Sequence, residues 1–154
     1  MFNAMLIAVL LALTAWYSAT RIDTGAVVTH TAQRGQASAM AAYRQAVVAY
    51  FTAHPDRYRA APSAGLMAPG APMAQAGEGA FANYRLDDGT IVVYALAPQP
   101  GLTGELLALS QRSRMVGHFS GGVFRPALSP ASGTLAAPEV AIPNGGPVWL
   151  AAAN

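Results

Sequence analysis

The first 20 residues, MFNAMLIAVLLALTAWYSAT, constrain the fold most, because they contain no charged side chain. The stretch from Ala4 to Tyr17 is apolar except for Thr14. The uncharged span as a whole, about 17 residues, lies at the short end of the roughly 17–25 residues that cross a bilayer as a helix. Trp16 and Tyr17 end this stretch, and such amphipathic rings favour the membrane interface. We therefore predict a transmembrane anchor over residues 1–20. The side chains that we expect to hold it in lipid are Leu6, Ile7, Val9, Leu10, Leu11, Leu13, Trp16 and Tyr17.

Two other interpretations of this stretch stay open, namely a cleaved signal peptide and a helix buried in a protein core. A signal peptide needs a basic start and small residues before the cut. The chain starts without Lys or Arg, and a cut after Ala19 would leave the bulky Tyr17 where a small residue is needed. A type IV prepilin leader is not matched either, because the stretch has no basic leader, no Gly and no Glu, and the first acid is Asp23. An uncleaved anchor fits best.

The orientation of such an anchor follows weakly from charge. The positive-inside rule counts Lys and Arg near the two ends of the membrane span. The N-terminal side offers only the α-amino group, whereas Arg21 and Arg34 follow the span. Taken alone, this count favours a cytoplasmic C-terminal domain, although Asp23 offsets Arg21.

A polar, Thr-containing segment over residues 21–35 follows the anchor, and we predict that it is a stalk or linker. Gly25 and Gly35 are weak points at which a helix either continues or breaks. From about Gln36, apolar residues recur every three or four positions until His54-Pro55, where the proline ends the helix. The predicted core stripe of this amphipathic helix consists of Met40, Tyr43, Val47 and Phe51.

Strand signals follow a long Pro-, Gly- and Ala-rich loop over residues 57–80, and we expect a partner surface in that loop. The turn Asp87-Asp-Gly-Thr90 joins two β-rich runs and predicts a hairpin. A short Leu-rich helix, which Thr103 is placed to cap, comes next, and a second hairpin turns at residues 120–122. Residues 139–142 and 148–150 are expected to form a C-terminal pair of strands.

The predicted fold class is therefore α+β. A long N-terminal helix leads into an amphipathic helix, which packs on a small antiparallel sheet in the manner of pilins. We assign residues 36–154 to this one domain, and we find no repeat and no second domain.

Candidate chemistry is sparse in the sequence. There is no Cys and no Lys, so disulfides, thiolate metal sites and lysine chemistry are excluded. His30, His54 and His118 lie in separate segments without a metal-ligand partner at short spacing, and Asp87-Asp88 is explained by its turn. No G-x-S-x-G nucleophile elbow and no phosphate-binding loop are present. We expect no catalytic residue, no metal, no cofactor and no enzymatic activity.

Charge also limits the partners. Only 10% of the residues are charged and the net charge is +2, with the Arg residues scattered along the chain, so we expect no binding of nucleic acid. The alanines at positions 4, 8, 12 and 15 would allow a second helix to pack closely, which leaves a homo-oligomer open.

The order of these features resembles the PilM family of conjugative-plasmid and genomic-island type IV pilus systems, which is distinct from the actin-like protein of the same name. The similarity covers nearly the whole chain. The matching stretches are the N-terminal apolar helix, residues 40–50 (MAAYRQAVVAY), 91–94 (IVVY), 100–102 (PGL) with the Leu-rich helix, 116–122 (VGHFSGG) and 141–146 (AIPNGG).

This resemblance implies a non-enzymatic role in pilus biogenesis at the bacterial inner membrane, and hence in conjugation. It implies a single-pass protein with its C-terminal domain in the periplasm, against the Arg count above. The expected partners are other pilus assembly proteins or pilins, together with lipid around the N-terminal helix. Two alternatives are a minor pilin-like subunit of the fibre and a secreted periplasmic enzyme.

Overall fold

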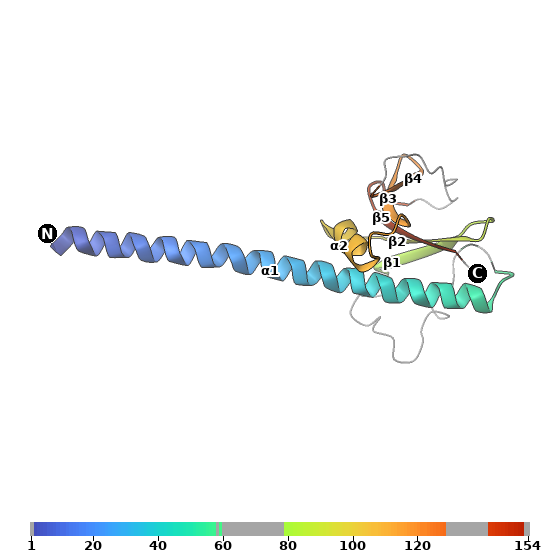
Figure 1. Cartoon of the computed structure of the whole chain (residues 1–154), viewed down its shortest axis with the longest axis horizontal. Helices are drawn as coiled ribbons and strands as arrows, with labels where there is room; N and C mark the ends of the chain where they lie inside the picture. Colours follow the sequence, from blue (N-terminus) through green and yellow to red (C-terminus); the bar gives the residue numbers. More distant parts are fainter. Residues whose placement is uncertain (1, 58, 60–78, 129–141, 153–154) are drawn as a thin grey trace. The chain divides into compact units, whose positions relative to one another are not determined.

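The computed structural model describes residues 2–57, 59, 79–128 and 142–152, and it divides the chain into two compact units, residues 1–32 and 33–154. Within α1, the side chains at positions 2–4, 6, 8, 15 and 18–28 lie outside the description. The elements, labelled in Figure 1, are α1 (Phe2–Ala53), β1 (Phe81–Arg85), β2 (Thr90–Ala95), α2 (Leu102–Leu109), β3 (Val116–Ser120), β4 (Val123–Pro126) and β5 (Pro147–Ala152).

Helix α1 is continuous from Phe2 to Ala53. The segment over residues 21–35, for which the sequence leaves helix or break open, is therefore helical, and neither Gly25 nor Gly35 interrupts it. The second compact unit begins at Gln33, three residues before the predicted start of the domain. Among the residues that the structure describes, no helix carries an apolar run of the length needed to cross a membrane.

The five strands form one antiparallel sheet in the order β1-β2-β5-β3-β4. Both predicted hairpins are confirmed, with Arg85 opposite Ile91 in the first and Ser120 opposite Val123 in the second. The first turn closes because Gly89 has a φ of 85°, which costs glycine little, and the carboxylate of Asp88 accepts a hydrogen bond from the Thr90 N–H at 2.8 Å.

The C-terminal strand occupies a different place from the one that we predicted. Instead of pairing with residues 139–142, β5 lies between β2 and β3, with Val93 and Val116 both opposite Trp149. Residues 139–141 lie outside the described part, and Ile142 is not in a strand. The central position of β5 explains its nearly unbroken apolar sequence, because a strand flanked on both sides and covered on both faces has little contact with water.

The start of α2 also differs from the prediction. Gly101, with φ 85°, is the N-cap, and no side chain caps the helix, so Thr103 lies inside the first turn. A left-handed residue is needed there because the chain reverses between Pro100 and Leu102, and glycine adopts that conformation without strain. Leu102 and Leu106 are buried, whereas Leu109 is exposed.

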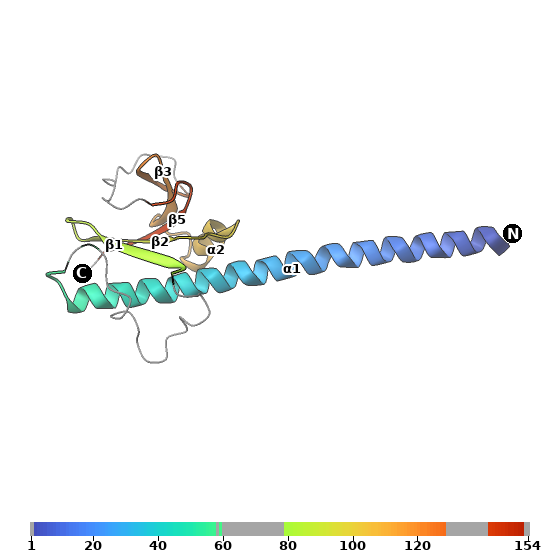
Figure 2. The same ribbon diagram turned by 180° about the vertical axis from the view of Figure 1, so that it is seen from behind.

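The main core lies between the helices and one face of the sheet (Figure 1). The structure places all four residues of the predicted stripe in this core, each no more than 8% exposed. They contact sheet residues that alternate along the strands, such as Ile91 and Val93 on β2. The reverse view in Figure 2 shows β1 and β2 next to the C-terminal half of α1, while β3 lies beyond β5. The fold is thus α+β, with a helix packed on a five-stranded antiparallel sheet.

A second, smaller cluster lies on the opposite face of the sheet. It is built by Val92, Tyr94, Phe119, Phe124, Val148 and Leu150. Both faces of β2 and β5 are therefore buried, which is why neither strand shows the alternation of polar and apolar residues seen in sheets with one wet face.

Candidate functional site

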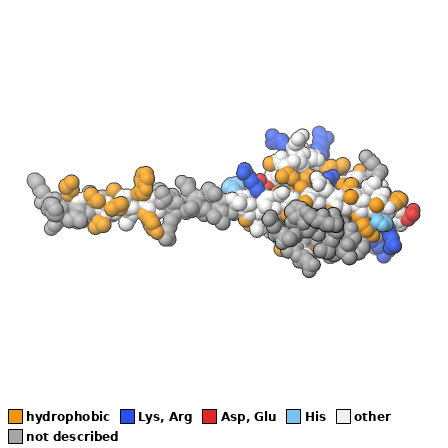
Figure 3. Space-filling view, turned by 90° about the horizontal axis from the view of Figure 1, so that it is seen from below, with side chains coloured by type: hydrophobic (Ala, Val, Ile, Leu, Met, Phe, Trp, Pro, Cys, Tyr) orange, Lys and Arg blue, Asp and Glu red, His pale blue; other side chains and the backbone are white. Residues whose placement is uncertain are grey.

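Large apolar side chains are exposed along the N-terminal half of α1. Those that the structure describes are Met5, Ile7, Val9, Leu10, Leu11, Leu13, Trp16 and Tyr17, all at least half exposed (Figure 3). They include every predicted anchor residue except Leu6, whose side chain lies outside the description. Large apolar side chains exposed this densely mark a contact surface for lipid or for another protein.

Thr14 is the one polar side chain within this stretch. Its hydroxyl donates to the carbonyl oxygens of Leu10 and Leu11, each at 3.0 Å. A threonine that bonds back to its own helix presents mainly its methyl group to the surroundings. The helix surface around Thr14 is therefore more apolar than a threonine side chain alone would suggest.

The polar side chains of Gln33 and Gln36 attach α1 to the loop before α2. Gln33 Nε2 donates to the Pro100 carbonyl oxygen at 2.6 Å, and Gln36 Nε2 donates to the Ala97 carbonyl oxygen at 3.0 Å. Gln36 Oε1 also accepts from the Gln99 N–H at 3.1 Å. We call this group of contacts the glutamine clamp. It is the first tertiary attachment of the second unit along the chain.

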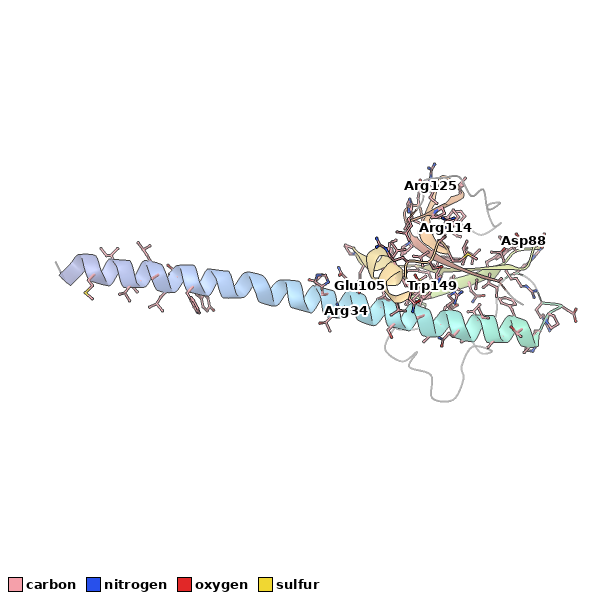
Figure 4. All side chains as sticks on the ribbon, viewed as in Figure 1. Arg34, Asp88, Glu105, Arg114, Arg125 and Trp149 are labelled. Carbon is pink, nitrogen blue, oxygen red and sulfur yellow. The ribbon has the colours of Figure 1, made fainter. Side chains whose placement is uncertain are left out.

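Beside the clamp, Arg34 Nε lies 3.5 Å from Glu105 Oε2 on α2 (Figure 4). The Arg34 side chain is 77% exposed, so water and salt screen this ion pair and it adds little stability. The exposed ion pair therefore contributes little to the position of the α2 loop.

Deeper in the domain, Arg44 lies against β5. Its guanidinium carbon is 4.9 Å from the centroid of the Trp149 ring, and its Nε and Nη2 donate to the Leu150 carbonyl oxygen at 3.2 and 3.1 Å. Burial lowers the pKa of Arg44 from its ordinary value. Arg44 is not among the residues of the predicted stripe, and the sequence does not indicate this role because a stacked cation leaves no periodic signal.

A second buried polar contact joins α1 to β1. The Asn83 side-chain amide donates to the Tyr43 hydroxyl at 2.7 Å. The pKa of Tyr43 is raised, mainly by burial and to a smaller extent by Tyr94. The hydrogen bond from Asn83 lowers this pKa but does not cancel the upward shift. Burial likewise raises the pKa of Tyr94. This contact sets the position of the helix along the strand, because a displaced Tyr43 would leave the buried amide without this acceptor.

Arg85 fastens the end of α1 in a similar way. It is 8% exposed, and its Nη1 donates to the carbonyl oxygens of Pro55 and Arg57 at 2.9 and 3.0 Å. Its guanidinium carbon is also 5.5 Å from the centroid of the Phe51 ring. Arg85 thus satisfies carbonyl groups of the chain that leaves the helix, which the sequence alone did not indicate.

The comparisons with known proteins agree with this architecture. A model of the PilM family matches residues 6–150, which is nearly the whole chain. The chain belongs to the PilM family. Among solved structures, the chain is similar to the crystal structure of a protein assigned as PilM from Escherichia coli B7A, with 26% sequence identity and a TM-score of 0.56. That similarity covers 79% of this chain and 94% of the other. No curated protein matches the chain.

The structure describes the surroundings of several ionisable groups of this PilM family member. No group of three or more His, Asp and Glu side chains that could hold a metal ion occurs there. The His54 ring is stacked on Tyr50 with centroids 4.5 Å apart, and its Nδ1 is 2.9 Å from the Tyr50 carbonyl oxygen. His118 lies on β3 opposite Arg125, and Asp88 closes its turn. Each of these candidates has a structural role or a surface position.

The hairpin of β3 and β4 brings two basic residues together, because Arg125 lies opposite His118. Arg112 and Arg114 on the α2–β3 connection and Arg125 on β4 are all exposed. Arg114 and Arg125 are labelled in Figure 4, and Asp88 lies at the tip of the other hairpin. The predicted partner surface in the loop over residues 57–80 lies almost entirely outside the description.

Proposed function

We propose that this PilM family member is an inner-membrane-anchored, non-enzymatic component of a type IV (thin, conjugative) pilus assembly machinery. It acts by binding other pilus proteins. Membership of the PilM family supports the role in pilus assembly. The single observation that carries the anchoring is the row of exposed apolar side chains from Met5 to Tyr17, since water is a poor solvent for such a surface.

The proposed topology is a single pass with the C-terminal domain in the periplasm. Two charged residues follow the apolar stretch closely, Arg21 and Asp23, and their opposite charges leave little net signal for a cytoplasmic domain. Lipid would surround the side chains from Ile7 to Leu13, with Trp16 and Tyr17 at the interface. The domain that follows presents polar and cationic side chains, and these would meet the partner proteins.

Support for a non-enzymatic role comes from the structural roles of the polar side chains. Tyr43, Asn83 and Arg85 hold α1 to the sheet, and Arg44 holds it to β5. Because these polar side chains hold the domain together, the activity that we propose is the binding of other pilus proteins.

The experiment compares two double variants in a piliated strain that lacks the native copy. Leu10→Glu/Leu13→Glu places two charges in the exposed apolar stretch, at a cost of about 2.5–3.5 kcal/mol for each charge near the centre of a bilayer. Ser38→Glu/Gln45→Glu adds the same charges at exposed positions of α1 in the second unit.

The first variant is expected to leave the membrane fraction and to abolish pili and mating, while the second variant retains both. A Leu10→Glu/Leu13→Glu protein that is soluble and still restores normal piliation would overturn the proposal.

A further inference from the structure

The sequence contains a single Asn-Gly pair, Asn144-Gly145, and it lies in an exposed turn shortly before β5. The Gly146 N–H donates to the Pro143 carbonyl oxygen at 3.0 Å, which closes a four-residue β-turn. Gly145 has a φ of 79°, whereas Asn144 does not have a positive φ. The turn is therefore of type II, in which the first central residue, here Asn144, has a ψ of about +120°.

This turn is docked on the second hairpin through its backbone and through one side chain. The Gly145 N–H donates to the Phe119 carbonyl oxygen at 2.6 Å, and the Phe119 N–H donates to the Gly146 carbonyl oxygen at 3.1 Å. Asn144 Oδ1 accepts a hydrogen bond from the Gly121 N–H at 3.0 Å. Docking thus fixes the side-chain carbonyl group of Asn144 and the backbone nitrogen that follows it, while both residues stay exposed to water.

An asparagine that precedes glycine is prone to deamidation, because glycine has no side chain to hinder the approach of its backbone nitrogen. In this reaction the Gly145 nitrogen loses its proton and forms a bond to Asn144 Cγ, and ammonia leaves. Water then opens the cyclic imide. Hydrolysis of the bond between nitrogen and Cγ gives aspartate with the original backbone. Hydrolysis of the original peptide bond gives isoaspartate, whose backbone runs through the side-chain carbons and is longer.

The docked turn hinders the attack. Ring closure needs a negative ψ at the asparagine, and a type II turn holds this angle at about +120°. The Phe119 carbonyl oxygen also retains the proton that the Gly145 nitrogen must lose, and the Gly121 N–H holds the Asn144 side chain in place. We propose that Asn144 is a conformationally controlled deamidation site, which reacts when the turn undocks from the second hairpin. Such local opening costs less free energy than global unfolding.

The two products affect the turn differently. An aspartate carboxylate can still accept the bond from the Gly121 N–H, so the turn can dock again. In isoaspartate the longer main chain displaces Gly145 and Gly146 from Phe119. Gly146 leads directly into β5, whose first residue, Pro147, lies opposite His118 on β3. Isoaspartate would therefore loosen the pairing of β3 with β5. This chemistry concerns the domain alone and is independent of how the chain is anchored.

The test follows deamidation of the full chain in detergent at mildly alkaline pH. Glu139 is the last acid in the chain, so cleavage after glutamate releases a fragment of residues 140–154 that contains Asn144. Tandem mass spectrometry locates the deamidated residue. The reference is a synthetic peptide of residues 141–148, AIPNGGPV. We expect the folded chain to deamidate at least about tenfold more slowly than the peptide, because it reacts only while the turn is open. The chain in concentrated urea should approach the rate of the peptide.

A variant that loosens the turn tests the role of docking. Gly146→Ala keeps the Asn-Gly pair, and its added Cβ would lie 3.0 Å from the Pro143 carbonyl oxygen. Gly104→Ala is the matched control, since nothing lies within 4 Å of the position of its Cβ apart from the local backbone of its own helix. We expect Gly146→Ala to react at least about threefold faster than the unchanged chain, and Gly104→Ala to stay within about twofold. A peptide that carries the Gly146→Ala replacement corrects for any change in intrinsic rate.

Equal rates in the folded chain and the peptide would overturn the proposal, because docking would then not hinder the reaction. So would the absence of deamidation in both the folded chain and Gly146→Ala while the peptides react, because the turn would then not open. Hydrogen exchange at the Phe119 amide distinguishes the products. Asn144→Asp should keep the slow exchange of the unchanged chain, and the isoaspartate fraction should exchange faster.

Discussion

Arg44 lies over the ring of Trp149, with its guanidinium carbon 4.9 Å from the ring centroid, and it donates twice to the carbonyl oxygen of the next residue, Leu150. One side chain of α1 thus holds both the side chain and the backbone of the central strand. Because β5 pairs with β2 and β3, this contact joins the helix to the middle of the sheet.

Replacing Arg44 with Ala is expected to lower the free energy of unfolding of the domain by about 2–3 kcal/mol, since it removes a stacked cation and the hydrogen bonds to a partly buried carbonyl oxygen. Arg44→Lys keeps the charge without the planar fork and should recover only part of this loss. Urea denaturation followed by Trp149 fluorescence in a Trp16→Phe background measures both. The exposed Arg57→Ala is the control, with an expected change within about 0.5 kcal/mol. A loss of that same small size for Arg44→Ala would contradict the role assigned to the stack.

The Tyr43 phenol predicts a loss of stability at high pH. Its pKa is raised in the folded state above the unfolded value of about 10, mainly by burial, so folding favours the protonated phenol. The contribution of the phenol to stability is complete below about pH 10 and is lost as the pH rises through the folded pKa. Tyr43→Phe should therefore cost about 1 kcal/mol at pH 8 through the lost bond from Asn83, and the difference from the unchanged chain should shrink above about pH 10. Urea titrations at the two pH values test this, and a difference that stays constant or grows would exclude the raised pKa.

The second hairpin leaves no room for a side chain at Gly117. A Cβ at this position would collide with the backbone carbonyl oxygen of Arg125 and lie 2.8 Å from the ring of Phe124. Gly117→Ala should destabilise the domain by more than about 2 kcal/mol, because backbone cannot move aside as a flexible side chain does. Gly35→Ala is the matched control. Apart from the local backbone of its own helix, nothing lies within 4 Å of the position of its Cβ, and an alanine within a helix should stabilise by about 0.5–1 kcal/mol. Thermal melts of both variants give the comparison, and equal effects would refute the steric explanation.

The glutamine clamp is expected to stabilise the loop before α2 rather than the whole domain. Gln36→Ala removes the bonds to Ala97 and Gln99, and the exposed loop should then open more often while the core is unchanged. Hydrogen exchange at the Gln99 amide is expected to quicken about tenfold, which corresponds to roughly 1.4 kcal/mol. Arg34→Gln removes the neighbouring exposed ion pair and should leave this exchange within about twofold. Unchanged exchange in Gln36→Ala would show that the clamp does not hold the loop.

Much of the domain could be predicted from short-range patterns. Both hairpins are predicted by their turn sequences, Asp87-Asp-Gly-Thr90 and Ser120-Gly-Gly122. The turn residues and the two strands that they join are adjacent in the sequence, so the pattern is visible there. The helical spacing from Met40 to Phe51 likewise follows directly from the periodicity of a helix face. These signals are local, and the structure reproduces them.

The position of β5 could not be predicted in this way. Its partners, β2 and β3, are distant in sequence, and a mostly apolar run such as Val148-Trp-Leu150 suits any central position. The start of α2 shows a second reason why sequence patterns fail. Either a capping side chain such as Thr103 or a left-handed glycine such as Gly101 can begin a helix, and the sequence does not say which one does.

The polar contacts were harder to foresee than the apolar core. Gln33 and Gln36 meet residues more than 60 positions away, and Arg44 meets a carbonyl oxygen 106 positions away. The pairing of Arg125 with His118, by contrast, follows from the local hairpin of β3 and β4. Long-range packing thus determines the polar contacts of Gln33, Gln36 and Arg44, while local patterns determine the elements that carry these residues.

The central claim, a chain anchored by its N-terminal helix with its domain in the periplasm, is tested most directly by thiol labelling. The chain contains no cysteine, so Ala108→Cys on the exposed side of α2 and Asn3→Cys at the N-terminus each introduce a single thiol. Spheroplasts are treated with a membrane-impermeant maleimide before and after permeabilisation. We predict that Ala108→Cys is labelled in intact spheroplasts and Asn3→Cys only after permeabilisation. Labelling of Ala108→Cys only after permeabilisation, or its recovery in the soluble fraction, would contradict the account.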